Sequence, residues 1–165
     1  TLACGGHPVA AVICLMFSGF CDMFDGIVAR TKKDRTAEEC SYGIQLDSLS
    51  DVICFGVLPV VIGASVGANE WWQIAIMALF ALCGLIRLAY YNVTEEVRQK
   101  SETGKRKHYL GVPITSSALT VPLLFCFGGL LGRNFPLAYT LLLLVNGALF
   151  VLYLLHICRC RRYKL

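Results

Sequence analysis

Long apolar runs alternate with short polar stretches along this chain of 165 residues. Each run approaches 20 residues, the length at which an α-helix crosses the roughly 30 Å hydrocarbon core of a bilayer. The runs and their polar boundaries predict five membrane spans: Val9–Arg30, Gly43–Gly63, Trp71–Asn92, Leu110–Leu131 and Pro136–Cys158. We therefore expect an all-α fold, a polytopic membrane helical bundle, with residues 1–165 forming one membrane-embedded domain.

Composition supports the membrane assignment. Charged residues make up 16% of the chain and hydrophobic residues 56%, whereas a soluble domain carries about 25% charged residues. The nine cysteines lie mostly inside apolar runs and form no C-x-x-C pair, so we interpret them as small hydrophobic side chains.

Basic residues concentrate in three polar stretches, Arg30–Tyr42, Val93–Tyr109 and Arg159–Leu165, which together hold most of the 15 Lys and Arg residues. By the positive-inside rule these stretches face the cytoplasm, so the net charge of +4 reflects topology and we expect no nucleic-acid partner. Lys32–Cys40 and Val93–Tyr109 are predicted to be solvated loops. Thr1–Pro8 would then lie outside, and we expect a preceding membrane helix to be missing from the sequence.

Four aspartates, Asp22, Asp25, Asp47 and Asp51, lie within or at the ends of the first two spans. An ionisable side chain in a membrane helix is costly and by default suggests a functional site. The first pair is spaced by three residues and the second by four, so each pair projects from one helix face. Because the two spans are antiparallel and joined at the cytoplasmic side, we expect the pairs to converge there.

Oxygen ligands without His or Cys favour Mg²⁺, Mn²⁺ or Ca²⁺. Four carboxylates could hold two such ions, an arrangement suited to displacement at phosphorus in a diphosphate substrate. Composition and spacing leave two alternatives open: a cation-coupled transporter, whose ion path is also lined by acids, and an acidic span boundary neutralised by Arg30 or Lys32.

The residues around the aspartates resemble the signature of the CDP-alcohol phosphotransferase family. The chain has D-x-x-D-G-x-x-A-R from Asp22 to Arg30 and G-x-x-x-D-x-x-x-D from Gly43 to Asp51. The spacer between these two parts is longer than the commonest form of the signature. The resemblance implies a six-helix fold, of which five spans are visible here. It also implies a metal-dependent phosphotransferase, which makes the transporter the weaker alternative.

The resemblance also implies roles for individual residues. Asp22, Asp25, Asp47 and Asp51 would bind Mg²⁺ or Mn²⁺, as two ions, and Asp51 would also be the catalytic base. The CDP-diacylglycerol pocket would be lined by Asp22, Gly26, Ala29, Arg30 and Gly43. For Gly26 and Ala29, a small-residue contact between helices remains the structural alternative.

Beyond the signature, L-D-S-L-S-D-V from Leu46 to Val52 and F-G-V-L-P from Phe55 to Pro59 resemble the phosphatidylserine synthase branch. This implies that L-serine receives the phosphatidyl group and that CMP leaves. A sister enzyme that uses inositol, glycerol phosphate or another alcohol is the alternative. Candidate contacts for serine or a phosphate are Arg87, Asn92, Thr115 and Ser116. Arg87 could equally snorkel to the interface or pair with an aspartate.

The same resemblance implies a homodimer in the bilayer. We expect the plasma (inner) membrane, with the active site facing the cytoplasm.

Overall fold

The computed structural model describes residues 2–29, 36–101 and 114–162, and every regular element in these ranges is a helix. In chain order the elements are α1 (Pro8–Ala29), α2 (Ala37–Asp51), the π-helix η1 (Val52–Val57), α3 (Leu58–Ser65), α4 (Trp71–Ser101), the 3₁₀ turn η2 (Ile114–Ser116), α5 (Ser117–Cys126), α6 (Gly128–Leu131), the 3₁₀ turn η3 (Gly132–Asn134) and α7 (Phe135–Arg162). The all-α prediction is confirmed.

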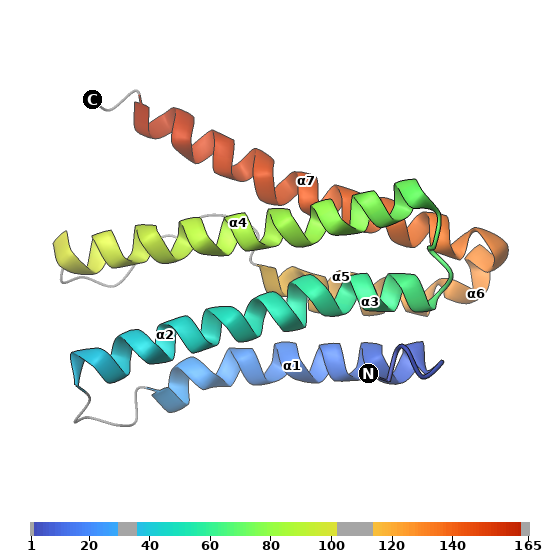
Figure 1. Ribbon diagram of the computed structural model, residues 1–165, viewed down its shortest axis with the longest axis horizontal. Coiled ribbons are helices and arrows are strands. Elements are labelled where there is room, and N and C mark those ends of the chain that lie inside the picture. The colour runs from blue at the N-terminus through green and yellow to red at the C-terminus, as the bar shows by residue number, and fades with distance from the viewer. Residues whose placement is uncertain (1, 30–35, 102–113, 163–165) are drawn as a thin grey trace.

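The long helices run side by side, and α2, η1 and α3 follow one another as one continuous rod (Figure 1). The final turns of α1, α4 and α7 and the first turn of α2 lie at one end of the bundle, on the left of Figure 1. We call this the basic end, because the three basic stretches of the sequence join the helices there. The opposite end holds the start of α1, the turn from α3 to α4, and α6.

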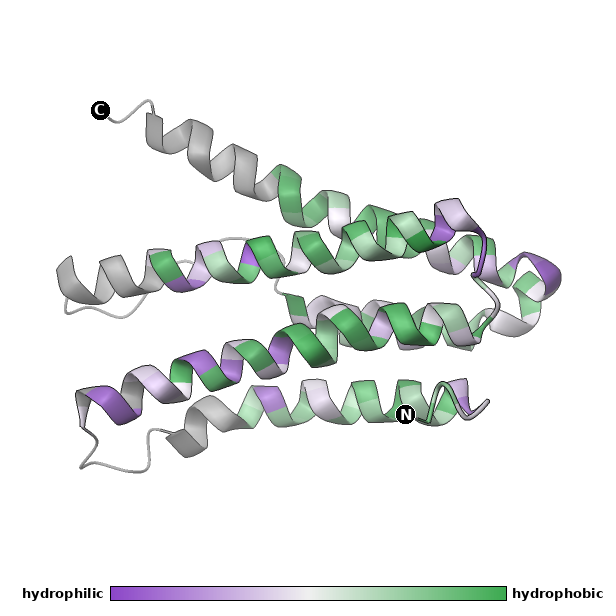
Figure 2. Cartoon of the chain, viewed as in Figure 1, coloured by the Kyte–Doolittle hydropathy of each residue, from purple (hydrophilic) through white to green (hydrophobic). Residues whose placement is uncertain are grey.

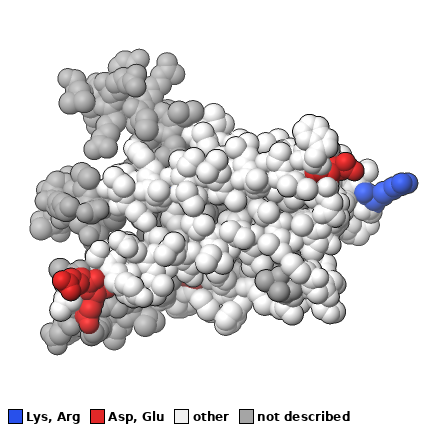
Figure 3. All heavy atoms as spheres, viewed as in Figure 1, with Lys and Arg blue, Asp and Glu red and all other residues white. Residues whose placement is uncertain are grey.

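Among the described residues, three helical segments are long and apolar enough to span a membrane: Ser41–Ser65, Trp71–Thr94 and Gly128–Leu152. Two shorter apolar helices, Pro8–Phe24 and Ile114–Cys126, accompany them. Apolar residues cover the middle of the bundle, and hydrophilic residues gather toward its ends and along the first half of α2 (Figure 2). On the face drawn in Figure 3, charged side chains of described residues lie mainly near the two ends. The chain is an integral membrane protein.

The second span begins earlier than predicted. Residues 37–40, expected as part of a solvated loop, form the first turn of α2. Thr36 caps the start of α2 with a capping box: its Oγ1 accepts from the Glu39 backbone N–H at 3.2 Å, and the Glu39 carboxylate accepts from the Thr36 N–H at 3.3 Å. This pair satisfies two backbone donors that a helix start otherwise leaves without partners. The rest of that predicted loop, residues 32–35, lies outside the described residues.

The loop prediction was also wrong for residues 93–101, because α4 continues without a break to Ser101. This stretch is polar, but Glu, Arg, Gln and Lys are good helix formers. The helix can therefore continue past the apolar segment with its backbone hydrogen bonds intact. A polar sequence therefore does not by itself indicate irregular structure. Residues 102–109 of the predicted loop lie outside the described part of the chain.

The fourth span is shorter than predicted and does not reach Leu131 as one helix. α5 ends at Cys126, and Phe127 adopts φ −92° and ψ 3° before the short α6 begins. Glycines follow at 128, 129 and 132, and Gly132 has φ +48°, a conformation that residues with a Cβ seldom adopt. The chain turns there into α7. Residues 110–113 of the predicted span lie outside the described ranges.

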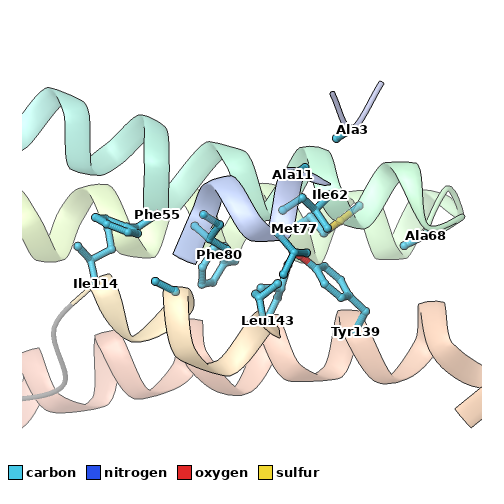
Figure 4. Packing of buried hydrophobic residues seen from close by; sticks show 14 of the residues in the cluster. Ala3, Ala11, Phe55, Ile62, Ala68, Met77, Phe80, Ile114, Tyr139 and Leu143 are labelled. Atoms are coloured by element: carbon cyan, nitrogen blue, oxygen red, sulfur yellow. The ribbon is translucent and has the colours of Figure 1, made fainter. Parts of the chain in front are cut away.

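The core forms where α4 and α7 cross the α3 and α5 region (Figure 4). Phe80 of α4 and Phe150 of α7 pack with ring centroids 5.9 Å apart. A Cβ on Gly147 would lie 3.5 Å from the Phe80 Cα, so the glycine lets the two backbones approach closely. Tyr139 is fully buried and donates its hydroxyl hydrogen to the Pro59 carbonyl at 2.7 Å, which ties α7 to α3.

Candidate active site

Three of the four predicted aspartates come together between two helices. One carboxylate oxygen from each of Asp22, Asp47 and Asp51 lies within 4.8 Å of the other two. Asp22 comes from α1 and the other two come from α2. Asp22 and Asp51 are half-buried, and Asp47 is exposed. The carboxylates of α1 and α2 therefore lie close together, and for Asp22, Asp47 and Asp51 the expected convergence is observed.

The buried stripe of α1 places Asp22. Ala11 and Leu15 are buried at a spacing of four residues. Gly19 follows at the same spacing, and Asp22 lies three residues further along the same helix face. At Gly19 the helix lies so close to α5 that an added Cβ would sit 2.8 Å from the Ala118 Cβ. The close contact of α1 with α5 at Gly19, one turn before Asp22, thus fixes where the Asp22 carboxylate meets α2.

The three carboxylates suit a divalent cation. Two oxygen ligands on opposite sides of one Mg²⁺ or Ca²⁺ lie about 4–5 Å apart, since each bond is about 2.0–2.6 Å long. The observed limit of 4.8 Å falls in that range. Three carboxylates this close also repel one another when ionised, and a bound cation offsets that repulsion. The donor set is oxygen only, which favours hard cations.

A π-helix begins directly after Asp51. Pro59 lacks a backbone N–H, so the Phe55 carbonyl four residues earlier loses the donor that an α-helix would supply. The helix widens over Val52–Val57, where the Leu58 N–H bonds to the Ile53 carbonyl five residues back. The Ser117 hydroxyl of α5 lies 3.1 Å from the Phe55 carbonyl and 3.1 Å from the Ile114 carbonyl, so its one hydrogen is shared between them and supplies Phe55 with a donor in place of the missing N–H. Single π-turns of this kind often accompany functional sites.

Ser117→Ala should lower the stability of the protein by about 1–3 kcal/mol, the cost of leaving a buried carbonyl without a partner. Ser117 is fully buried. Thermal unfolding in detergent measures the effect. The neighbouring Ser116→Ala is the matched control, because the buried Ser116 hydroxyl oxygen makes no hydrogen bond within the described structure. Equal unfolding temperatures for the two variants would contradict the role given to Ser117.

Ser48 lies between the two aspartates of α2 and links them to α4. Its hydroxyl donates to the Ile44 carbonyl at 2.8 Å, one turn earlier, and its oxygen accepts from the Asn92 Nδ2 at 2.7 Å. The second bond joins residues 44 positions apart in the chain. Asn92, a predicted substrate contact, is therefore connected to the aspartate segment through Ser48.

The other predicted acceptor contacts lie on α4 and η2. Arg87 is half-buried, and its Cζ lies 5.6 Å from the centroid of the Phe150 ring, a cation–π geometry. Thr115 and Ser116 are half-buried in η2, which packs against η1, the segment that follows Asp51. Their assignment as substrate contacts stays a prediction.

The remaining predicted residues are described less fully. Asp25, Gly26 and Ala29 belong to the last turns of α1, where the structure describes the helix but not the side chains. Arg30 lies outside the described residues. Gly43 lies on α2, and among the described residues no atom comes within 4 Å of the position that its Cβ would occupy.

Sequence reasoning did not identify Ser48 and Ser117 as site residues. The Phe-x-x-x-Pro spacing at Phe55 and Pro59 could have indicated a carbonyl without a donor. Nothing local in the sequence indicates which serine supplies the missing hydrogen bond, because Ser117 is 62 positions away. The same holds for the pairing of Ser48 with Asn92.

Comparison with known families agrees with the geometry. The family model described as CDP-alcohol phosphatidyltransferase matches residues 1–157, almost the whole chain. The chain belongs to the CDP-alcohol phosphatidyltransferase family. This membership covers both aspartate helices and the core that supports them.

Several curated proteins are similar to the chain in sequence. The CDP-diacylglycerol–serine O-phosphatidyltransferase of Saccharomyces cerevisiae is 36% identical over 140 residues, 82% of this chain and 49% of the relative. The archaetidylserine synthase of Methanothermobacter thermautotrophicus is 34% identical over 128 residues, 77% of this chain and 51% of the relative. The chain therefore spans about half the length of these curated relatives. No solved structure gives a significant match.

Proposed function

We propose that this protein transfers a phosphatidyl group from CDP-diacylglycerol to the hydroxyl of L-serine, giving phosphatidylserine and CMP. The observation that carries the proposal is the meeting of Asp22, Asp47 and Asp51 across α1 and α2. Family membership supports the phosphatidyl transfer. Serine as acceptor is supported by the names of two similar proteins, a serine O-phosphatidyltransferase and an archaetidylserine synthase.

The proposed reaction is a displacement at phosphorus. The serine hydroxyl oxygen bonds to the phosphorus that carries diacylglycerol, the bond from that phosphorus to the bridging oxygen breaks, and CMP leaves with the electron pair. Asp51 takes the hydroxyl proton as general base. Asp22, Asp25 and Asp47 would be the main metal ligands, and Asp51 would share one ion. Two Mg²⁺ or Mn²⁺ ions would neutralise the diphosphate and stabilise the charge of the leaving group.

Other residues of the proposed site bind and orient the substrates. Gly26, Ala29 and Gly43 leave room for the cytidine diphosphate, and Arg30 pairs with a phosphate. Arg87 is the candidate partner of the serine carboxylate, since a guanidinium binds a carboxylate with two hydrogen bonds. Asn92, Thr115 and Ser116 are candidates for the remaining polar groups of serine or for a phosphate.

We also infer that the site opens to the cytoplasm and that the protein works as a homodimer. Asp22 lies in the half of α1 that leads to the basic end, and Asp47 and Asp51 lie on the α2 part of the α2–η1–α3 rod, which begins at that end. The positive-inside rule places such stretches on the cytoplasmic side, where soluble serine is accessible. The dimer rests on resemblance to the family alone.

The test is product formation by the purified protein in mixed micelles containing CDP-diacylglycerol and Mn²⁺ or Mg²⁺. With L-serine we expect equimolar CMP and phosphatidylserine, and only background CMP with inositol or glycerol phosphate. Preferential CMP release with inositol or glycerol phosphate would identify a sister enzyme instead. Absence of CMP with every alcohol would contradict phosphatidyl transfer. Uptake of a solute into vesicles that depends on a cation gradient would then favour a cation-coupled transporter.

Gly43→Val should raise the KM for CDP-diacylglycerol by about 10-fold or more, because the side chain would enter the space assigned to the nucleotide. The protein itself has no described atom near this Cβ position, and glycine costs a helix roughly 0.5–1 kcal/mol relative to alanine. Stability should therefore be unchanged. Steady-state kinetics and thermal unfolding separate the two effects. Gly129→Val is the control, since its Cβ position is also open but lies at the opposite end. An unchanged KM in the Gly43 variant would remove Gly43 from the pocket.

A further inference from the structure

We propose that Asn92 is a positioning residue that, through Ser48, fixes the rotation of α2 and thereby the placement of Asp47 and Asp51. The inference rests on the proposed function, because it concerns how the same metal site is kept in shape. Its basis is the chain of hydrogen bonds from the Asn92 amide to the Ser48 hydroxyl and on to the Ile44 carbonyl.

Ser48 stands beside the aspartates on the helix surface. Successive residues of an α-helix are about 100° apart around its axis, so Ser48 lies about 60° from Asp51 and about 100° from Asp47. The aspartates meet Asp22 of α1, while Ser48 meets Asn92 of α4. The α2 segment is therefore tied on two sides, to α1 through the carboxylate cluster and to α4 through the serine.

The Ser48 hydroxyl is directed by its first bond. Its hydrogen is used by the Ile44 carbonyl at 2.8 Å, so its oxygen faces Asn92 as an acceptor only. The Asn92 amide has to donate, which fixes which of its two polar atoms points to α2. A bond of 2.7 Å between half-buried groups gives α2 a defined angular position relative to α4.

Rotation of α2 matters because metal ligands tolerate little displacement. A carboxylate oxygen about 5 Å from the helix axis moves by roughly 1.5–2 Å when the helix turns by about 20°. Metal–ligand distances vary by only about 0.2 Å in a well-formed site. Partners outside the ligand set change metal affinity by about 10- to 100-fold when they are removed.

The test measures Mn²⁺ binding to the purified protein without substrate, by the electron paramagnetic resonance signal of unbound Mn²⁺. We expect Asn92→Ala and Ser48→Ala each to weaken Mn²⁺ binding about 10-fold. The double variant should be no weaker than either single variant, because both changes break the same bond. Ser48→Thr should bind Mn²⁺ as the wild type does, since threonine keeps a hydroxyl that can bond one turn back in a helix.

Thr94→Val is the matched control. Thr94 is half-buried on the same helix, and its hydroxyl bonds to the Tyr90 carbonyl within α4 at 2.8 Å. Its removal should leave Mn²⁺ binding unchanged. Thermal unfolding of each variant shows whether any loss of binding comes from loss of the fold, and the Ser48→Thr variant repeats the test in a chain that keeps the bond.

Wild-type Mn²⁺ affinity in Asn92→Ala would overturn the inference, even if Asp47→Asn abolished binding and so supported the metal site. A raised KM for serine in Asn92→Ala with unchanged Mn²⁺ affinity would also overturn it and would make Asn92 a direct substrate contact. A wild-type protein that bound no Mn²⁺ would contradict the metal site of the proposed function, and the inference with it.

Discussion

Asp51→Asn should lower kcat for phosphatidyl transfer to serine by about 10²- to 10⁴-fold, the contribution usual for a general base. Asparagine keeps the shape of the side chain but cannot take the serine hydroxyl proton. Asp51 is half-buried at the last position of α2, directly before the π-helix. The rate of phosphatidylserine formation at saturating CDP-diacylglycerol and serine measures the effect.

The affinity of the Asp51→Asn variant for CDP-diacylglycerol distinguishes a general base from a residue with a purely structural role. If Asp51 acts mainly on the proton, the variant should bind CDP-diacylglycerol within a few-fold of the wild type and unfold at a similar temperature. Full activity in Asp51→Asn would remove Asp51 as the base. Loss of substrate binding together with loss of turnover would make it chiefly a metal ligand.

Asp47→Asn should weaken Mn²⁺ binding by more than about 100-fold, beyond the range seen when an outer partner of a metal ligand is removed. The physical reason is the loss of one of three carboxylates whose oxygens lie within 4.8 Å. Because Asp22 and Asp47 would hold the proposed cation from different helices, Asp22→Asn should have the same effect. Activity should recover in part at high Mn²⁺ concentration, which a titration of rate against Mn²⁺ measures.

Glu70→Gln is the control for the loss of one negative charge. Glu70 is exposed and precedes α4 at the opposite end of the bundle. Its replacement should leave the Mn²⁺ dependence unchanged. If Glu70→Gln and Asp47→Asn shifted the Mn²⁺ titration equally, the Mn²⁺ dependence would reflect the net charge of the protein. That result would contradict metal binding by Asp22, Asp47 and Asp51.

The centre of the candidate site could be predicted because its geometry is local. The spacing of Asp47 and Asp51 places them on one helix face, and a short connection makes their helix antiparallel to that of Asp22. Hydropathy located the membrane segments for a similar reason, since bilayer thickness sets a minimum length for each apolar run. Both rules need only residues close together in the chain.

Helix boundaries were predicted less well because backbone capping and propensity decide them. The Thr36 capping box starts α2 in polar sequence, and α4 extends to Ser101 through good helix formers. The helix break after Cys126 comes from a glycine-rich turn inside an apolar run. Hydropathy does not register any of these three features.

The contacts that hold the site in place were beyond sequence reasoning. Gly19 meets Ala118, Ser48 meets Asn92 and Ser117 meets Phe55, each across a long separation in the chain. Which small or polar residue faces which depends on how the helices cross, and apolar patterning specifies a buried face only coarsely. The residues that contact the aspartate-bearing helices can therefore be identified only from the folded structure.

Anomalous diffraction from crystals grown with Mn²⁺ and CDP-diacylglycerol tests the central claim most directly, because it locates the ions relative to named carboxylates. We predict manganese peaks about 2.0–2.5 Å from carboxylate oxygens of Asp22, Asp47 and Asp51, with the diphosphate of the substrate against the same ions. Manganese bound elsewhere, with a diphosphate that makes no contact with this cluster, would contradict the account.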